Sequence, residues 1–221
     1  TASGQVHPGA GTVTGGRIKI DAPDLPAAVK RIDNRIAVPP TFKDLAIQGG
    51  FVFEKGKAEF ADLRGRAGPV SATAKLSIVA SGKPSFNAAV DILTLPVDPL
   101  VDLALSFPPP KDAPKPGGGI DGRITLTVDA ARYRSSAVRN VAIAAHIHDG
   151  ALTVEKASGV APGGTRVSFD GQAAPRGGQA VFEGAMTGES DDLRAFLGWL
   201  GVDLSGIPAE RFRRGEVESS L

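Results

Sequence analysis

Apolar and polar residues alternate along much of this chain, and the clearest run covers residues 120–128. The even-numbered positions of this run include Ile120, Ile124, Leu126 and Val128. The odd-numbered positions are charged or hydroxylated residues, namely Asp121, Arg123, Thr125 and Thr127. Because a β-strand directs successive side chains to opposite faces, this run predicts a strand with one apolar and one polar face.

The same alternation recurs from residue 45 to residue 169, interrupted by many of the chain's 28 Gly and 17 Pro residues. Glycine at Lys55-Gly56 and Asp149-Gly150 favours tight turns between adjacent strands. The pattern therefore predicts a mainly β fold, built as an antiparallel sheet in which consecutive strands are neighbours. Its predicted apolar face comprises Ile47, Phe51, Phe53, Leu76, Ile78, Phe86, Val90, Ile124, Leu126, Ile143, Ile147, Leu152, Val154, Val167 and Phe169.

Two segments have helical rather than strand spacing. A short helix is predicted near residues 24–33, with Asp24 as its N-cap. A second is predicted near residues 191–200, where the Asp191-Asp192 pair complements the helix dipole and Gly201 ends the helix. Its apolar stripe favours packing on the sheet over a role as a lid or a membrane-surface helix.

Internal repetition suggests how the chain is organised. Residues 42–47 match residues 138–143 position for position, and each block runs on through a strand, a glycine-containing turn and another strand. We expect a first β repeat unit at 1–105, a Pro/Gly-rich loop or linker at 106–119, and a second unit at 120–221.

Composition narrows the functional classes. The net charge is only +1 and basic residues are not concentrated, so nucleic acid is not expected as a partner. The absence of cysteine excludes disulfides, thiolate metal sites and a cysteine nucleophile. No apolar run reaches the roughly 18 residues of a membrane span, so we expect any anchor to lie outside this sequence.

Candidate catalytic chemistry is sparse. His146 and His148 share one face of a predicted strand, as metal ligands would, but a third ligand with suitable spacing is missing and the polar face explains both. The glycine-rich stretches lack a phosphate-loop context, and no nucleophile elbow occurs. We therefore expect no enzyme activity, no metal and no cofactor.

The strand, turn and glycine pattern of residues 122–171 resembles the C-terminal repeat region of the AsmA-like bacterial envelope proteins. The resemblance rests on 122–130, Arg132-Tyr133, the 138–141 lead-in, the hairpin at 149–154 and the Gly163-Gly164 turn. It implies a bent or half-barrel β-sheet with an apolar groove, in the style of bridge-like lipid carriers. It also implies a periplasmic location, an anchor in the inner membrane and a role in outer-membrane assembly and lipid homeostasis.

An apolar sheet face must be covered by a second sheet, by helices or by a ligand such as acyl chains. The leading hypothesis is a segment that binds or conducts phospholipid or another acyl-chain lipid, with envelope proteins as further partners. The alternative is a structural or protein-interaction module with a closed core. A third hypothesis, carbohydrate binding, has little support, because Trp199 and Tyr133 are the sole Trp and Tyr.

Overall fold

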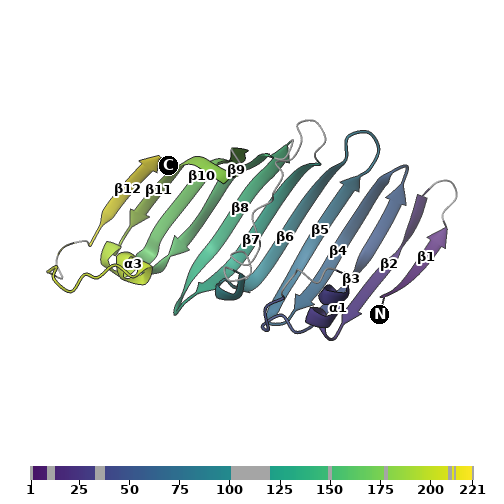
Figure 1. Cartoon of the computed structure of the whole chain (residues 1–221), viewed down its shortest axis with the longest axis horizontal. Coiled ribbons are helices and arrows are strands. Elements are labelled where there is room, and N and C mark those ends of the chain that lie inside the picture. The colour runs from purple at the N-terminus through teal and green to yellow at the C-terminus, as the bar shows by residue number, and fades with distance from the viewer. Residues whose placement is uncertain are drawn as a thin grey trace.

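The computed structural model consists of one long β-sheet with short helices beside it (Figure 1). It describes residues 2–8, 13–32, 38–100, 120–148, 151–176, 179–208, 211 and 213–220. The predicted loop at 106–119 and the predicted turn at Asp149-Gly150 lie outside the described residues.

Twelve strands follow the chain in order within this sheet. They are β1 (Ala2–Pro8), β2 (Val13–Ala22), β3 (Leu45–Glu54), β4 (Lys57–Ala67), β5 (Val70–Val79), β6 (Ser85–Pro96), β7 (Asp121–Tyr133), β8 (Ser136–His148), β9 (Ala151–Ala161), β10 (Thr165–Arg176), β11 (Gln179–Ser190) and β12 (Gly215–Ser220). The predicted mainly β, sheet-based fold is confirmed.

Every neighbouring pair of strands is antiparallel except β6 and β7, which run parallel. The predicted antiparallel sheet thus contains one parallel pair. A parallel pair cannot be joined by a tight hairpin, because the chain must return to the starting edge before the next strand begins. β6 ends at Pro96 and β7 begins at Asp121, and the two strands pair within the same sheet.

Two helices begin near the positions that the sequence predicts. In α1 (Leu25–Ile32), the Asp24 carboxylate accepts a hydrogen bond from the Ala27 backbone N–H at 2.9 Å. In α3 (Leu193–Leu200), the Asp192 carboxylate accepts one from the Ala195 N–H at 3.0 Å. Gly201 ends α3 in the left-handed conformation, with φ 89°. These contacts satisfy backbone groups that a helix end leaves unpaired.

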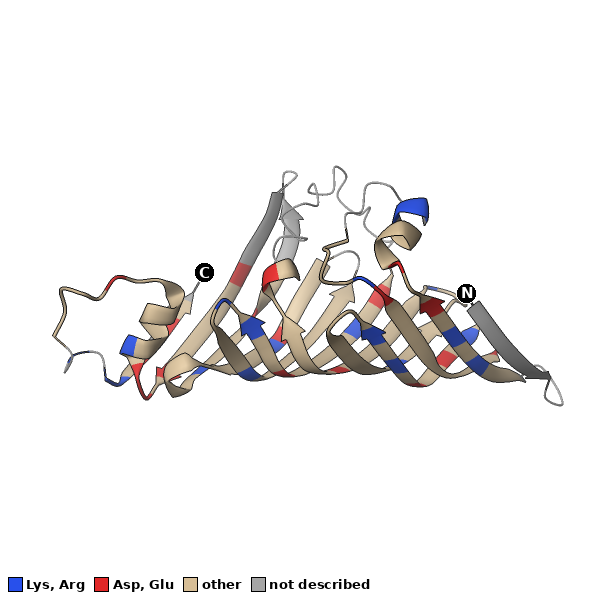
Figure 2. Ribbon diagram, turned by 90° about the horizontal axis from the view of Figure 1, so that it is seen from below, with Lys and Arg blue, Asp and Glu red and all other residues tan. Residues whose placement is uncertain are grey.

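The sheet does not close into a barrel. Figure 2, seen from below, shows it bent into an open trough, with helices on the open side. The few buried apolar residues in the described part of the chain are Phe42, Val70, Val128, Ala145 and Ala161. So few buried side chains indicate one layer of sheet rather than a two-layer core.

Candidate functional site: a continuous apolar face of the sheet

The strand register places the apolar residues of successive strands side by side. Residues that pair directly across two strands lie on the same face of a sheet. One cross-strand row therefore contains Phe53, Ala58, Ile78, Phe86, Gly122, Ile147 and Leu152. The next row on that face contains Phe51, Phe60, Leu76, Ala88, Ile124, Ala145 and Val154.

Two further rows complete the same surface. One joins Val90, Leu126 and Ile143, and the other joins Ile20, Ile47, Gly65, Ala72, Ile92, Val128 and Val141. Val167 and Phe169 of β10 extend these rows through their pairs with Gly159 and Ala157. All fifteen residues of the predicted apolar face thus lie on one face of the sheet. We call this surface, from Ile20 of β2 to β10, the apolar face.

Large side chains on the apolar face pack sideways over glycines. A Cβ atom on Gly122 would lie 2.1 Å from the Phe86 ring, and one on Gly171 or Gly184 would lie 2.9 Å from the Phe169 ring. The Phe86 ring therefore covers bare backbone of the neighbouring strand β7, and the Phe169 ring covers bare backbone of its own strand β10 and of β11. A single sheet shields part of its apolar surface in this way without a second layer.

Aromatic side chains also gather at the β3–β4 end of the apolar face. The ring centroids of Phe51 and Phe53 are 5.0 Å apart, and Phe60 lies 6.5 Å from Phe51 and 6.0 Å from Phe53. The Phe53 and Phe60 rings meet edge to face, with an interplanar angle of 87°. Aromatic pairs with such spacings contribute beyond the area that they bury.

Some side chains of the apolar face are exposed to solvent, and the others named above from the sequence pattern are half-buried. Phe53 is 44% exposed, Ile78 37% and Leu152 36%. The helix α3 lies at one end, where Leu193 packs against Gly215 of β12 and the Trp199 ring centroid is 6.2 Å from that of Tyr133. Among the described residues, neither α1 nor α3 packs broadly on the strands of the apolar face.

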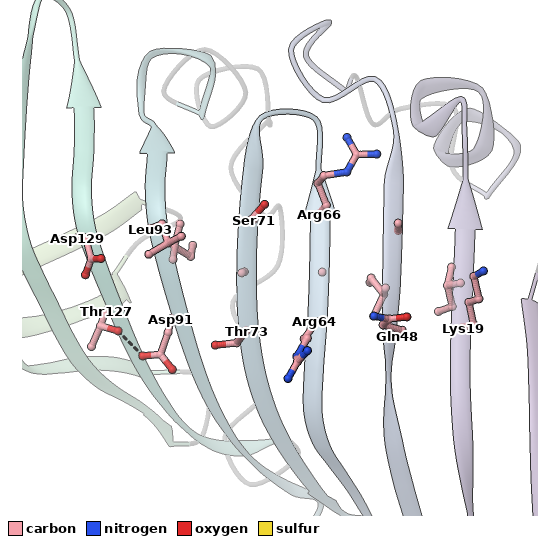
Figure 3. Close-up of a pocket in the computed structure, with 16 residues that line it drawn as sticks. Lys19, Gln48, Arg64, Arg66, Ser71, Thr73, Asp91, Leu93, Thr127 and Asp129 are labelled. Atoms are coloured by element: carbon pink, nitrogen blue, oxygen red, sulfur yellow. Dashed lines mark hydrogen bonds between the residues drawn. The ribbon is translucent and has the colours of Figure 1, made fainter.

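The apolar face lies on the inner side of the bend. Figure 3 looks onto the polar side chains of β2 to β7, and the strands beyond β7 turn away from the viewer. The polar side chains therefore point outward. The apolar residues of the opposite face line the trough.

A bulge in β4 interrupts the alternation of residues on the apolar face. Phe60 and Leu63 both belong to it, although they are three residues apart, because β4 contains a bulge beside Asp62. Asp62 adopts a positive φ of 52°, which Asp tolerates better than most residues. An Asp between two apolar residues three apart is the sequence signal for such a bulge. Other members of the same surface need no bulge, because they follow regular alternation: Ile20, Ile92, Val128 and Val141.

The opposite, outer face carries the charged residues. His146 Nδ1 lies 3.3 Å from Glu155 Oε1, and Arg123 donates a hydrogen bond to the same Glu155 oxygen at 3.0 Å. His148 Nδ1 lies 3.1 Å from Asp121 Oδ1. Each histidine thus pairs with a different carboxylate. No group of three or more His, Cys, Asp or Glu residues suited to a metal ion occurs within the described part of the chain.

The described residues contain no helix long and apolar enough to cross a membrane. Comparison with known proteins found no matching family model, no similar curated protein and no similar solved structure.

Proposed function

We propose that this chain is a periplasmic segment of an AsmA-like envelope protein that binds or conducts lipid along its apolar face. The observation that carries the proposal is the continuity of that face. Apolar residues pair directly from β3 to β10, and no charged side chain interrupts the two rows that contain Phe53 and Phe51.

The dimensions of the trough suit acyl chains. Neighbouring strands are about 4.8 Å apart, so eight strands from β3 to β10 extend over roughly 34 Å. An exposed apolar surface of this extent in water favours a permanent apolar ligand or partner. Acyl chains suit it because their contacts are non-directional, and the rows offer side chains of many sizes without polar groups that require partners.

The closed-core alternative is less well supported. It needs a second layer over residues such as Ile78 and Leu152, but their exposed fractions exceed one third among the described residues. The two outer-face histidines lend no support to enzyme activity, because His146 and His148 form ion pairs with two different carboxylates on neighbouring strands.

Site-directed photocrosslinking tests the lipid proposal. A photoreactive amino acid at Ile124 or Ile143 should form adducts with phospholipid when the protein is isolated from bacterial membranes in mild detergent. The matched control position is Thr125, which neighbours Ile124 on β7 but faces outward, and it should give far fewer adducts. Organic extracts without phospholipid, together with no lipid adduct at either apolar position, would reject the proposal.

Location is a separate part of the proposal. The parent protein, expressed at natural levels, should fractionate with the inner membrane, and this segment should be cleaved by protease only after the outer membrane is opened. Cleavage that requires lysis of the inner membrane would place the segment in the cytoplasm and contradict a periplasmic role.

A further inference from the structure

The outer face contains a groove that runs across the strands from β2 to β7 (Figure 3). Its volume is about 690 Å³. The floor is formed by the backbone of Ile20, Ile47, Gly65, Ala72 and Ile92, which pair in one row and whose side-chain positions belong to the apolar face. We call this feature the outer groove.

Two rows of outward side chains form its walls. The first wall is a row of directly paired residues, namely Lys19, Gln48, Arg64, Thr73, Asp91 and Thr127. The second wall contains Ala46, Arg66, Ser71, Leu93 and Asp129. On each strand the residues of the two walls are two positions apart, which is about 6.6 Å. The groove crosses six strands, so it is much longer than it is wide.

Charge is divided along the first wall. Lys19 and Arg64 are cationic at the β2–β4 end, and neither has an ion-pair partner in the described part of the chain. Asp91 is anionic at the β6 end and accepts a hydrogen bond from the Thr127 hydroxyl. Thr73 stands between Arg64 and Asp91, which are two strands, or about 10 Å, apart. That separation is too long for a direct ion pair.

The second wall adds an apolar contact and another carboxylate. Leu93 is 67% exposed on this otherwise polar face. It neighbours Asp91 along β6 and lies beside Asp129 in the groove lining. Asp129 has no ion-pair partner among the described residues. An exposed leucine between two carboxylates is unusual on a solvated face and suits contact with a partner side chain.

We propose that the outer groove binds an extended peptide segment that carries an acidic residue, an apolar residue three positions further along and a basic residue directly after the apolar one. An extended peptide advances about 3.3 Å per residue, so three residues cover the roughly 10 Å from Arg64 to Asp91. Successive side chains of an extended peptide point alternately to the two walls. The acidic side chain meets Arg64 on the first wall, and the apolar one, three positions further along, contacts Leu93 on the second wall. The basic one, directly after it, faces the first wall again and meets Asp91.

Other classes of ligand fit less well. The carboxylates of Asp91 and Asp129 repel a phosphate backbone, which disfavours nucleic acid. Among the described residues no aromatic side chain lines the outer groove, so they provide no stacking surface of the kind that a glycan would use. The proposal does not depend on lipid binding, because the groove lies on the face opposite the trough.

The probe is the fluorescein-labelled peptide Gly-Thr-Glu-Thr-Thr-Leu-Lys-Gly, and the measurement is fluorescence anisotropy against the full chain. Arg64→Gln and Asp91→Asn should each weaken binding about two- to fivefold, the range of an exposed ion pair. Leu93→Ser should weaken it about fivefold or more. The matched control is Lys75→Gln, which removes a cation from the outer face of β5 outside the groove and should leave binding unchanged.

The same variants separate this proposal from the lipid proposal. All of them should retain wild-type binding of an acyl-chain probe and a wild-type far-ultraviolet circular dichroism spectrum. Absence of saturable peptide binding by the wild-type protein below about 1 mM, a weak affinity even for a transient site, would overturn the inference. Equal losses in Lys75→Gln and Arg64→Gln would also overturn it, because binding would then follow net charge alone.

Discussion

Phe53 and Val52 offer a sharp test of whether the inner and outer faces differ in function. They are consecutive on β3, so their side chains lie on opposite faces, and their exposed fractions are nearly equal at 44% and 41%. Phe53→Ser removes an aromatic ring from the apolar face. Val52→Ser removes a similarly exposed apolar group from the outer face. The pair thus controls for position in the chain and for fractional exposure.

The expected loss follows from the exposed area of Phe53. Aromatic residues bury about 150–250 Å², so a 44% exposed phenylalanine presents roughly 90 Å² to a ligand. At about 25 cal/mol per Å², complete coverage by an acyl chain contributes about 2 kcal/mol. Since about 1.4 kcal/mol corresponds to a tenfold change in affinity, Phe53→Ser should weaken acyl-chain binding about thirtyfold. Val52→Ser should leave it unchanged.

The assay is the fluorescence of cis-parinaric acid titrated with each protein, accompanied by urea unfolding to measure stability. Phe53→Ser should also lower the free energy of unfolding, because Phe53 contacts Phe51 and Phe60. Acyl-chain binding is therefore compared without urea, under conditions in which both variants are shown to be folded. Equal weakening by the two substitutions, or full affinity in folded Phe53→Ser, would refute the assignment of lipid to the apolar face.

Three further predictions concern packing over a glycine, the cap of one helix and the pKa of one carboxyl group. Gly122→Ala should lower the free energy of unfolding, measured in urea, by about 1–3 kcal/mol, because the new methyl displaces the Phe86 ring. The control is Gly198→Ala on α3, where the methyl meets nothing within 4 Å, and it should be neutral or stabilising. Asp192→Ala should cost about 1 kcal/mol by removing the cap on the Ala195 N–H, and Asp192→Asn, which can still accept that hydrogen bond, should recover most of it. The pKa of Asp203 should lie below the ordinary aspartate value, because the Ser205 backbone N–H donates to its carboxylate, and a carboxyl NMR titration that shows an ordinary or raised pKa would contradict this contact.

The sequence alone determined which residues share a face within each regular strand, and it located the helix ends. Alternation depends on local backbone geometry, so Ile124 and Leu126 could be assigned to one face without knowledge of their neighbours. Helix caps are equally local, because Asp24 and Asp192 bond to backbone groups three residues away. These features follow from residues close together in the chain.

Only the tertiary structure decided how the strands join into one surface. The apolar face is continuous only if the register of each strand pair places apolar residues opposite one another. That register depends on pairing between segments that are distant in the chain. Bulges make this harder to read from the sequence. At Asn140, where φ is 51°, Val138 and Val141 both approach Gly159, although strict alternation would place them on opposite faces.

The parallel pairing of β6 with β7 and the outer groove are also tertiary results. Phe86 and Gly122 are 36 positions apart, yet the Phe86 ring lies where a Gly122 side chain would be. The outer groove joins β2 to β7 through six aligned residues whose spacing in the chain follows no simple period. The sequence determined the chemistry of each strand face, whereas long-range pairing determined which faces meet, because backbone hydrogen bonds between strands do not depend on side-chain identity.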